Sequence, residues 1–224
     1  MTEFDYSREF WEGLPRFVII EGSDGAGKST LVEGLVTWMR DVLQLDVEQL
    51  REPGSGAIAA RIRELLLFAT DENISTYEEI LLMTTARVDT RLKHAQPALA
   101  AGKWVVCDRG ELSSIVYQGF ARDEGCMKFV KELQDQIQVI VRRADLYVIL
   151  QISDEEALRR LGGTGKQPDR FEGAGDRFRT RVRKGFEMLG QLVPGEYRMA
   201  YVDAECSPEA LVQRVIATIQ DECM

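Results

Sequence analysis

Short apolar runs alternate along the chain with longer stretches in which apolar residues recur at helical spacing. The short runs are rich in β-branched and aromatic residues, which is typical of buried strands. They predict five strands, at Arg16–Glu21, Asp46–Leu50, Trp104–Cys107, Leu146–Gln151 and Met199–Val202. The longer stretches predict helices, at Ser7–Gly13, Gly27–Leu43, Ala57–Ala69, Thr76–Ala101, Ser113–Phe120, Met127–Arg143, Asp154–Leu161, Arg177–Leu192 and Pro208–Gln220.

Alternation of strands and helices indicates βα units, whose strands pair in parallel between layers of helices. We therefore expect an α/β fold in which a five-stranded parallel sheet carries helices on both faces. A chain of 224 residues is long enough for one large domain with its own core. We assign residues 16–224 to this domain and residues 1–15 to an N-terminal extension.

Composition and charge exclude several classes of protein. The formal net charge of −9 argues against a broad nucleic-acid-binding surface, although a local arginine cluster can still bind a small anion. No apolar run approaches the ~20 residues of a membrane span, and the first residues lack the apolar core of a signal peptide. The four cysteines have no metal-binding spacing, which favours reduced thiols and a cytoplasmic location.

The first predicted strand leads directly into the sequence Gly-Ser-Asp-Gly-Ala-Gly-Lys-Ser at residues 22–29, which opens a helix. This GxxxxGK[ST] pattern is a P-loop, because glycines let backbone N–H groups converge on phosphate oxygens at a helix N-terminus. Lys28 is expected to reach the β- and γ-phosphates of ATP, and Ser29 to ligate Mg²⁺. The predicted ATP-binding residues are Gly22, Ser23, Gly25, Ala26, Gly27, Lys28, Ser29 and Thr30. A tight glycine-rich turn with a surface lysine is the alternative.

Two arginines follow predicted strands. Arg51 opens the sequence Arg-Glu-Pro-Gly after the second strand, and Arg109 follows Asp108 after the third. Ligands bind at the carboxyl ends of parallel strands, so these side chains could form two arms of a phosphate clamp. Each arginine taken alone is more typical of a surface ion pair.

The motifs in order resemble the thymidylate kinase family of the bacterial type. They are the P-loop, Arg-Glu-Pro-Gly, the Leu81–Arg87 stretch, Asp-Arg followed by Leu-Ser-Ser and Tyr-Gln-Gly, and Asp169–Glu172. The resemblance runs from Arg16 to Ile219. It implies a P-loop NTPase fold, a homodimer, and transfer of phosphate from ATP, with Mg²⁺, to a deoxynucleoside monophosphate such as dTMP.

By position, the resemblance also assigns roles on the acceptor side. Asp24 would hold the sugar 3′-hydroxyl, Arg51 and Arg109 the acceptor's phosphate, and Asp108 would lie near Mg²⁺. The base and sugar would be contacted by Met83, Arg87, Ser113, Ser114, Tyr117 and Gln118. Tyr117 would crowd the 2′ position, and Arg87 would bind the base edge. Ordinary alternatives are a core tyrosine at Tyr117 and helix capping by the two serines.

A basic, glycine-containing segment at about residues 160–181 resembles the lid that closes over ATP in this family. Relatives without an arginine inside the P-loop take a catalytic arginine from the lid, and this P-loop has Gly25 at the position in question. The predicted catalytic residues are therefore Lys28, Arg109, Arg160 and Arg170. Lys166 is a further candidate for the lid cation, and a solvated charged face is the alternative.

One departure from the family bears on the acceptor. Met83 stands where relatives place an aromatic residue against the base, and Thr84 follows it. A thioether packs on a base without the flat face of a ring. A 5-modified dUMP, or another deoxynucleotide, is therefore an alternative acceptor. A nucleotide-binding partner without catalytic activity is a second alternative, which the intact motif residues disfavour.

Overall fold

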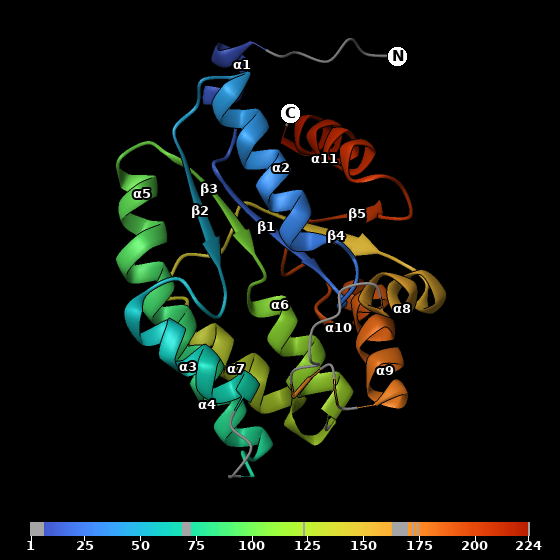
Figure 1. Cartoon of the computed structure of the whole chain (residues 1–224). Coiled ribbons are helices and arrows are strands. Elements are labelled where there is room, and N and C mark those ends of the chain that lie inside the picture. Colours follow the sequence, from blue (N-terminus) through green and yellow to red (C-terminus); the bar gives the residue numbers. More distant parts are fainter. Residues whose placement is uncertain are drawn as a thin grey trace.

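The computed structural model describes residues 7–68, 73–122, 124–162, 170–171, 173 and 175–223. Its centre is a five-stranded parallel sheet in the order β2-β3-β1-β4-β5 (Figure 1). The strands are β1 (Phe17–Gly22), β2 (Val47–Arg51), β3 (Trp104–Asp108), β4 (Leu146–Gln151) and β5 (Met199–Asp203). The predicted α/β fold is confirmed, and each strand begins and ends within one residue of its prediction.

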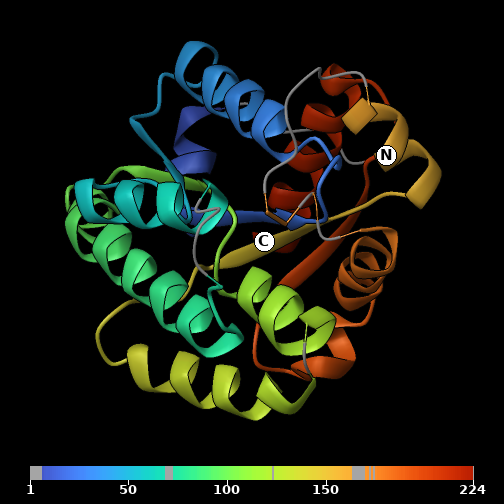
Figure 2. The ribbon, with the colours of Figure 1, turned by 60° about the horizontal axis from the view of Figure 1, so that its bottom comes forward.

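Helices cover both faces of the sheet, and alternation along the strands divides the core in two (Figure 2). On β1, Val18 and Ile20 face α2 (Lys28–Asp41) and α11 (Pro208–Cys223). Phe17 and Ile19 face the opposite layer. That layer includes α5 (Gln96–Ala100), α6 (Glu111–Ser114), α7 (Met127–Ile137), α9 (Asp176–Glu187) and α10 (Leu189–Leu192). Because β1 is buried on both faces, its sequence is a continuous apolar run up to Glu21.

The N-terminal segment is part of this core. The predicted helix is present as α1 (Arg8–Glu12), which the Ser7 side chain caps by accepting a hydrogen bond from the Phe10 N–H. Trp11 is fully buried and packs edge-on against Trp38 and at a tilt against Trp104, with ring centroids 5.3 and 5.6 Å away. The extension therefore covers the amino-terminal end of the sheet and belongs to the same hydrophobic cluster as α2.

Four predicted helices are divided or shorter than expected. The stretch Arg177–Leu192 forms α9 and α10, and Ser113–Phe120 spans the end of α6 and a π-helical segment. The stretch Thr76–Ala101 forms α4 (Thr76–Thr90), a π-helical turn η1 (Arg91–Ala95) and α5. The stretch Met127–Arg143 is helical only to Ile137. The remaining elements are α3 (Ala57–Phe68), η2 (Ile115–Arg122, π-helical), η3 (Glu124–Cys126) and α8 (Asp154–Gly162). None of the described helices is long and apolar enough to cross a membrane.

The sheet brings three sequence motifs to one edge. β1 ends in the P-loop, β2 ends at Arg51 and β3 ends at Asp108. Arg51 is paired in register with Asp108, and Ile20 of β1 is paired with Asp108 on its other side. The carboxyl ends of these three adjacent strands form the floor of a ligand site, as in other open α/β sheets.

Candidate active site

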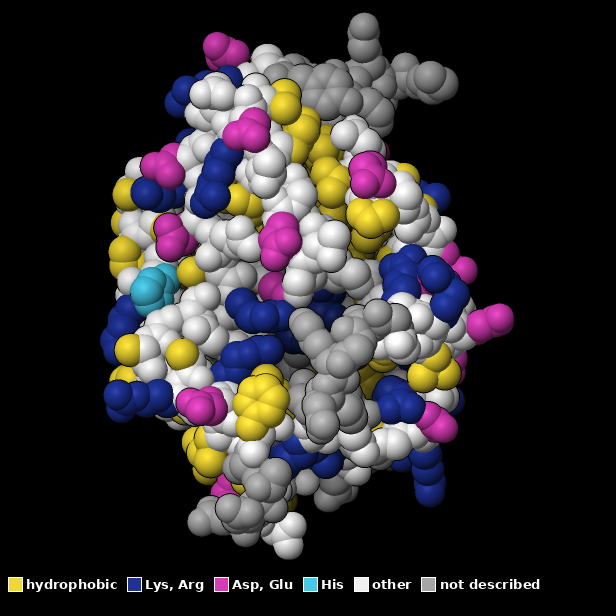
Figure 3. Space-filling view, in the orientation of Figure 1, with side chains coloured by type: hydrophobic (Ala, Val, Ile, Leu, Met, Phe, Trp, Pro, Cys, Tyr) yellow, Lys and Arg dark blue, Asp and Glu magenta, His cyan; other side chains and the backbone are white. Residues whose placement is uncertain are grey.

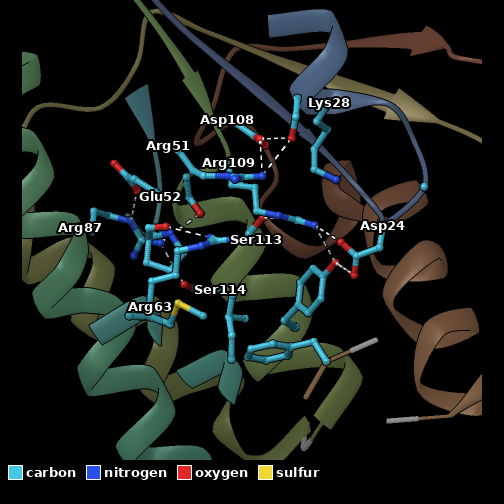
Figure 4. Close-up of a pocket in the computed structure, with 18 of the residues that line it drawn as sticks. Asp24, Lys28, Arg51, Glu52, Arg63, Arg87, Asp108, Arg109, Ser113 and Ser114 are labelled. Atoms are coloured by element: carbon cyan, nitrogen blue, oxygen red, sulfur yellow. Dashed lines mark hydrogen bonds and ion pairs between the residues drawn. The ribbon is translucent and has the colours of Figure 1, made fainter. Parts of the chain in front are cut away.

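A cavity of about 400 Å³ lies at the carboxyl ends of β1, β2 and β3 (Figure 4). Most of the predicted site residues line it: Asp24, Gly25, Gly27, Lys28, Ser29, Thr30, Arg51, Met83, Arg87, Asp108, Arg109, Ser113, Ser114, Tyr117, Gln118 and Arg160. Lysine and arginine side chains gather around this hollow on the surface in Figure 3. A protein with net negative charge therefore has a locally basic site, as binding of phosphate groups requires.

The P-loop curls through glycine conformations that other residues rarely adopt. Gly25 and Gly27 have φ angles of +82° and +89°, and Gly27 caps the N-terminus of α2. A Cβ on Gly25 would lie 2.7 Å from the Ala157 carbonyl oxygen of α8, so a larger residue at this position meets α8. Ala26 packs its side chain into the core and offers only its backbone to a ligand. Gly22 and Ser23 do not line the main cavity; Ser23 lines a smaller one beside it.

Lys28 is held inside the loop. Its Nζ donates to the Ser23 carbonyl oxygen at 2.6 Å, and the side chain is 7% exposed. Burial, together with the nearby charge of Arg109, lowers the pKa of Lys28 to about 8, although Asp24 and Asp108 oppose the shift. A bound triphosphate would supply negative charge at this amine and favour its charged form.

Ser29 and Asp108 offer a site that fits Mg²⁺. Ser29 Oγ donates to Asp108 Oδ2 at 2.7 Å. Asp108 Oδ1 is buried and has no hydrogen-bond partner among the described residues. The described chain contains no group of three or more His, Cys, Asp or Glu side chains suited to a metal. Mg²⁺ needs no such group, because it is commonly held by one carboxylate, a hydroxyl, phosphate oxygens and water.

Arg109 stands between the P-loop and η2. Its backbone is left-handed, with φ of 72°, which is uncommon for a residue with a side chain. Nη2 forms an ion pair with Asp24 and donates to the Tyr117 hydroxyl at 3.1 Å, and that hydroxyl donates to Asp24 at 2.9 Å. Burial raises the pKa of Asp24, but Arg109 and Lys28 outweigh burial and the net pKa is lowered.

Arg51 approaches the cavity from β2. Its Nη2 donates to Ser29 Oγ at 3.0 Å and lies 3.3 Å from Asp108 Oδ2, and its side chain is 48% exposed. Arg51 and Arg109 therefore enter the same cavity from two strands, as the sequence predicted for a clamp. Both side chains are held by oxygen atoms of the protein at the cavity wall.

The far end of the cavity is lined by Met83, Arg87 and Ser114. Arg87 is 3% exposed and donates to Glu52, Gln134 and Ser114 at 2.8, 2.9 and 3.0 Å. This network fixes the guanidinium at the cavity wall, where its predicted contact with a base edge stays a prediction. Thr84, which follows Met83, does not line the cavity: its hydroxyl is buried and donates to the Ile80 carbonyl oxygen.

The two predicted lid arginines lie in different places. Arg160 of α8 contacts Glu156 and the Ala204 carbonyl oxygen, and its Nη1 lies beside Gly27. Arg170 instead donates to Glu79 of α4 and to the Leu66 carbonyl oxygen. In this structure a buried carboxylate of α4 holds Arg170, and its role as a cation at the transferring phosphate stays a prediction. Lys166, the other candidate, lies outside the described residues.

Sequence reasoning missed several residues of the site. Glu79 is fully buried and accepts hydrogen bonds from Gln118, Arg122 and Arg170. Phe171 lines the main cavity and packs edge-on against Tyr117 with ring centroids 5.9 Å apart. A second groove runs from the P-loop along Thr30, Arg160, Cys206 and Pro208. Two of these had a sequence signal: Glu79 is an acid on the apolar face of a predicted helix, and Phe171 lies in the Asp169–Glu172 motif.

Comparisons with known proteins agree with this geometry. A family model described as thymidylate kinase matches residues 20–215. A thymidylate kinase of Alkalilimnicola ehrlichii is 39% identical over 200 residues, which cover 88% of this chain and 88% of the relative. One from a Jannaschia species is 39% identical, covering 90% of this chain and 94% of the relative. One from a Psychrobacter species is 34% identical, covering 93% and 99%.

Proposed function

The chain belongs to the thymidylate kinase family, and on this basis we propose that it transfers the γ-phosphate of ATP to dTMP, giving ADP and dTDP. One observation carries the proposal: Lys28, the Ser29–Asp108 pair and the two arginines Arg51 and Arg109 line a single cavity. The P-loop end of this cavity suits a triphosphate, and the arginine end suits a second phosphate. A kinase that transfers phosphate from one nucleotide to another requires both of these phosphate sites.

The transfer is a direct in-line displacement. An oxygen of the acceptor's phosphate forms a bond to the γ-phosphorus, and the bond from that phosphorus to the bridging oxygen of ADP breaks. The attacking oxygen is already anionic, so the enzyme needs no strong general base. Lys28 and the P-loop amides stabilise charge on the transferring group, and Arg51 and Arg109 hold the acceptor. Ser29 and Asp108 would hold Mg²⁺, which neutralises phosphate charge when bound.

We assign the lid's contribution to Arg160. It extends from α8 beside Gly27, and α8 also fills the space next to Gly25 where a P-loop side chain would lie. The groove along Thr30, Arg160, Cys206 and Pro208 continues from the P-loop and suits the nucleoside of ATP. Arg160 would then lie between the nucleoside and the phosphates, close enough to contribute positive charge to the reaction.

The base end supports a second candidate acceptor, a dUMP with a polar 5-substituent. Met83 lines the cavity where an aromatic contact with the base is expected, and a flexible thioether adapts to a larger group. We expect Met83→Phe to lower the KM for dTMP about five- to tenfold, because an aromatic contact adds about 1 kcal/mol. The same change should reduce relative activity on 5-hydroxymethyl-dUMP.

The measurement is kcat/KM for dTMP, dUMP, 5-hydroxymethyl-dUMP and dGMP with both proteins. Purines should remain poor in each. An unchanged ratio between dTMP and the 5-modified acceptor in Met83→Phe would contradict a role for this position in base choice. Strong preference of the native protein for dTMP would then leave dTMP as the acceptor.

We also propose that the protein is a homodimer. α3 and α4 pack against each other, and their outer faces carry exposed apolar side chains: Ile58, Leu65, Tyr77 and Leu81, between 42% and 53% exposed. Such a face is characteristic of a subunit interface. Among the described residues Cys107, Cys126 and Cys206 form no disulfide, which together with the use of ATP supports a cytoplasmic location.

Replacing Leu81 with glutamate should convert the dimer to a monomer, because it places a charge on an interface that depends on apolar burial. Sedimentation analysis measures the mass of each protein. Val139→Glu is the matched control, since Val139 is an apolar residue that is 88% exposed and belongs to neither α3 nor α4. A native protein that sediments as a monomer, or a Leu81→Glu protein that stays dimeric, would contradict the assigned interface.

A further inference from the structure

Glu21 is a fully buried acid in an otherwise apolar strand, one residue before the P-loop begins. Its carboxylate accepts hydrogen bonds from the segment that follows β3. Oε1 accepts the backbone N–H groups of Gly110 and Ser113 at 2.9 and 3.0 Å, and Oε2 accepts the Ser113 hydroxyl at 2.5 Å. Gly110 precedes α6 and has no side chain with which to cap it. The carboxylate of β1 therefore supplies the acceptor for the start of the neighbouring helix.

This contact continues to Arg109. The Ser113 hydroxyl donates to Glu21 and accepts from Arg109 Nη1 at 3.2 Å. Arg109 has the left-handed backbone described above, a conformation that persists only where its surroundings fix it. On one side its backbone N–H donates to the Ile20 carbonyl oxygen, and on the other the next residue, Gly110, donates to Glu21. Glu21 thus holds both the backbone beside Arg109 and a hydroxyl at its guanidinium.

We propose that Glu21 is a positioning residue for phosphate transfer: through Gly110 and Ser113, its carboxylate holds Arg109 in the conformation that binds the acceptor's phosphate. The inference rests on the proposed function. Burial raises the pKa of Glu21 to about 7, although the Ser113 hydrogen bond and the Arg109 charge oppose the shift. Burying a carboxylate costs free energy unless it is hydrogen-bonded or paired with a charge. Here Gly110 and Ser113 supply the hydrogen bonds, and Arg109 supplies the nearby positive charge.

The carboxylate is ionised above about pH 7, and in this form both of its oxygens act only as acceptors. Oε2 then accepts the hydrogen bond from the Ser113 hydroxyl. Protonation at Oε2 turns the acceptor into a donor. Ser113 Oγ then faces two donors, Glu21 and Arg109, and the attraction between Glu21 and the guanidinium is lost. The charged and titratable groups that face Glu21 are Arg109, Glu111, Lys28 and Cys107. The pKa of Glu111 is about 2, and the pKa values of Arg109 and Cys107 lie above their ordinary ranges, so these three groups do not titrate near Glu21. The pKa of Lys28 is about 8, and its ionisation removes positive charge from the P-loop as pH rises, which lowers activity where ionisation of Glu21 raises it.

The test is Glu21→Gln. The amide oxygen can still accept the two backbone N–H groups, whereas the amide NH₂ replaces the carboxylate oxygen that accepts the Ser113 hydroxyl. We expect kcat/KM for dTMP to fall roughly tenfold, as for other losses of an outer-shell partner, while the KM for ATP changes less than about twofold. Between about pH 6 and pH 7.5, native kcat/KM for dTMP should rise through two ionisations, those of Glu21 and of the acceptor's phosphate, whose pKa is about 6. In Glu21→Gln only the second should remain. Any fall at higher pH that comes from loss of charge on Lys28 should be common to the native protein and the variant.

Three further proteins complete the design. Ser113→Ala should lose part of the same effect, and Glu33→Gln, on the exposed face of α2, should lose none. In an Arg109→Ala background, Glu21→Gln should have little further effect on the acceptor, since the two act as one unit. If Glu21→Gln is folded with native acceptor kinetics and pH profile, the inference is overturned. If it does not fold, native acceptor kinetics in Ser113→Ala overturn it. Absence of transfer in the native protein would instead contradict the proposed function.

Discussion

Replacing Lys28 with alanine should lower kcat for dTMP phosphorylation at least ~100-fold, the usual effect of losing one preorganised group that stabilises transition-state charge. Lys28 Nζ lies inside the P-loop, 2.6 Å from the Ser23 carbonyl oxygen, where the β- and γ-phosphates are expected. No other lysine lines the main cavity among the described residues. The arginines nearest to it in the cavity have other partners, Arg51 with Asp108, Arg109 with Asp24 and Arg160 with Glu156, so we expect none of them to replace the ammonium.

The fold should persist in Lys28→Ala, because the side chain lies in a loop and alanine is compatible with the first turn of α2. Thermal melting checks this directly. Lys128→Ala is the matched control, since the Lys128 side chain is 84% exposed on α7 and is remote from the site. A folded Lys28→Ala protein with near-native turnover would contradict the P-loop assignment.

Replacing Arg109 with alanine should lower kcat/KM about 100-fold for every monophosphate acceptor, because it removes charge-assisted hydrogen bonds to a phosphate that all acceptors share. Arg109 comes from the β3 end and is assigned no base contact. The ratio of kcat/KM between dTMP and dUMP should therefore stay within about twofold of native. Arg109→Lys should recover only part of the loss, since a single ammonium cannot replace a planar fork.

The measurement is a panel of acceptors at saturating ATP, with thermal melting of each variant. Arg109 also pairs with Asp24 at the cavity wall, so its loss is expected to lower stability to some extent. A defect confined to one base would contradict the clamp and would place Arg109 at the nucleobase instead.

The sheet was predictable because its strands are bounded by abrupt changes in polarity. β4, for example, begins after Asp145 and is apolar to Leu150, so its limits are visible in the sequence. The break in the helical stretch at Arg91 was not predictable from the sequence. Arg91 lies in the π-helical turn η1 and is buried by ion pairs with Glu52 and Glu111, which come from distant segments. Hydrophobic periodicity carries no record of such partners, so the stretch was predicted as one regular helix.

The site, too, was predictable in part. The P-loop and each acceptor motif are continuous stretches of sequence, and each strand end that carries one of them was predicted within one residue. Arg170 was predicted at the transferring phosphate, whereas it pairs with Glu79 on α4. A charge pattern identifies a basic segment but not the acid that each arginine meets. Glu21 is visible in the sequence as an acid within a predicted buried strand. Its hydrogen-bond partners, Gly110 and Ser113, are known only from the fold.

The most direct test is transfer of labelled phosphate by the purified protein. The native chain is incubated with Mg²⁺, dTMP and ATP labelled at the γ-phosphate, and the products are separated by chromatography. We predict that the label appears at the β position of dTDP with release of ADP, and that Lys28→Ala forms little of this product. Label released only as inorganic phosphate, or no labelled dTDP from a folded native protein, would contradict a thymidylate kinase activity.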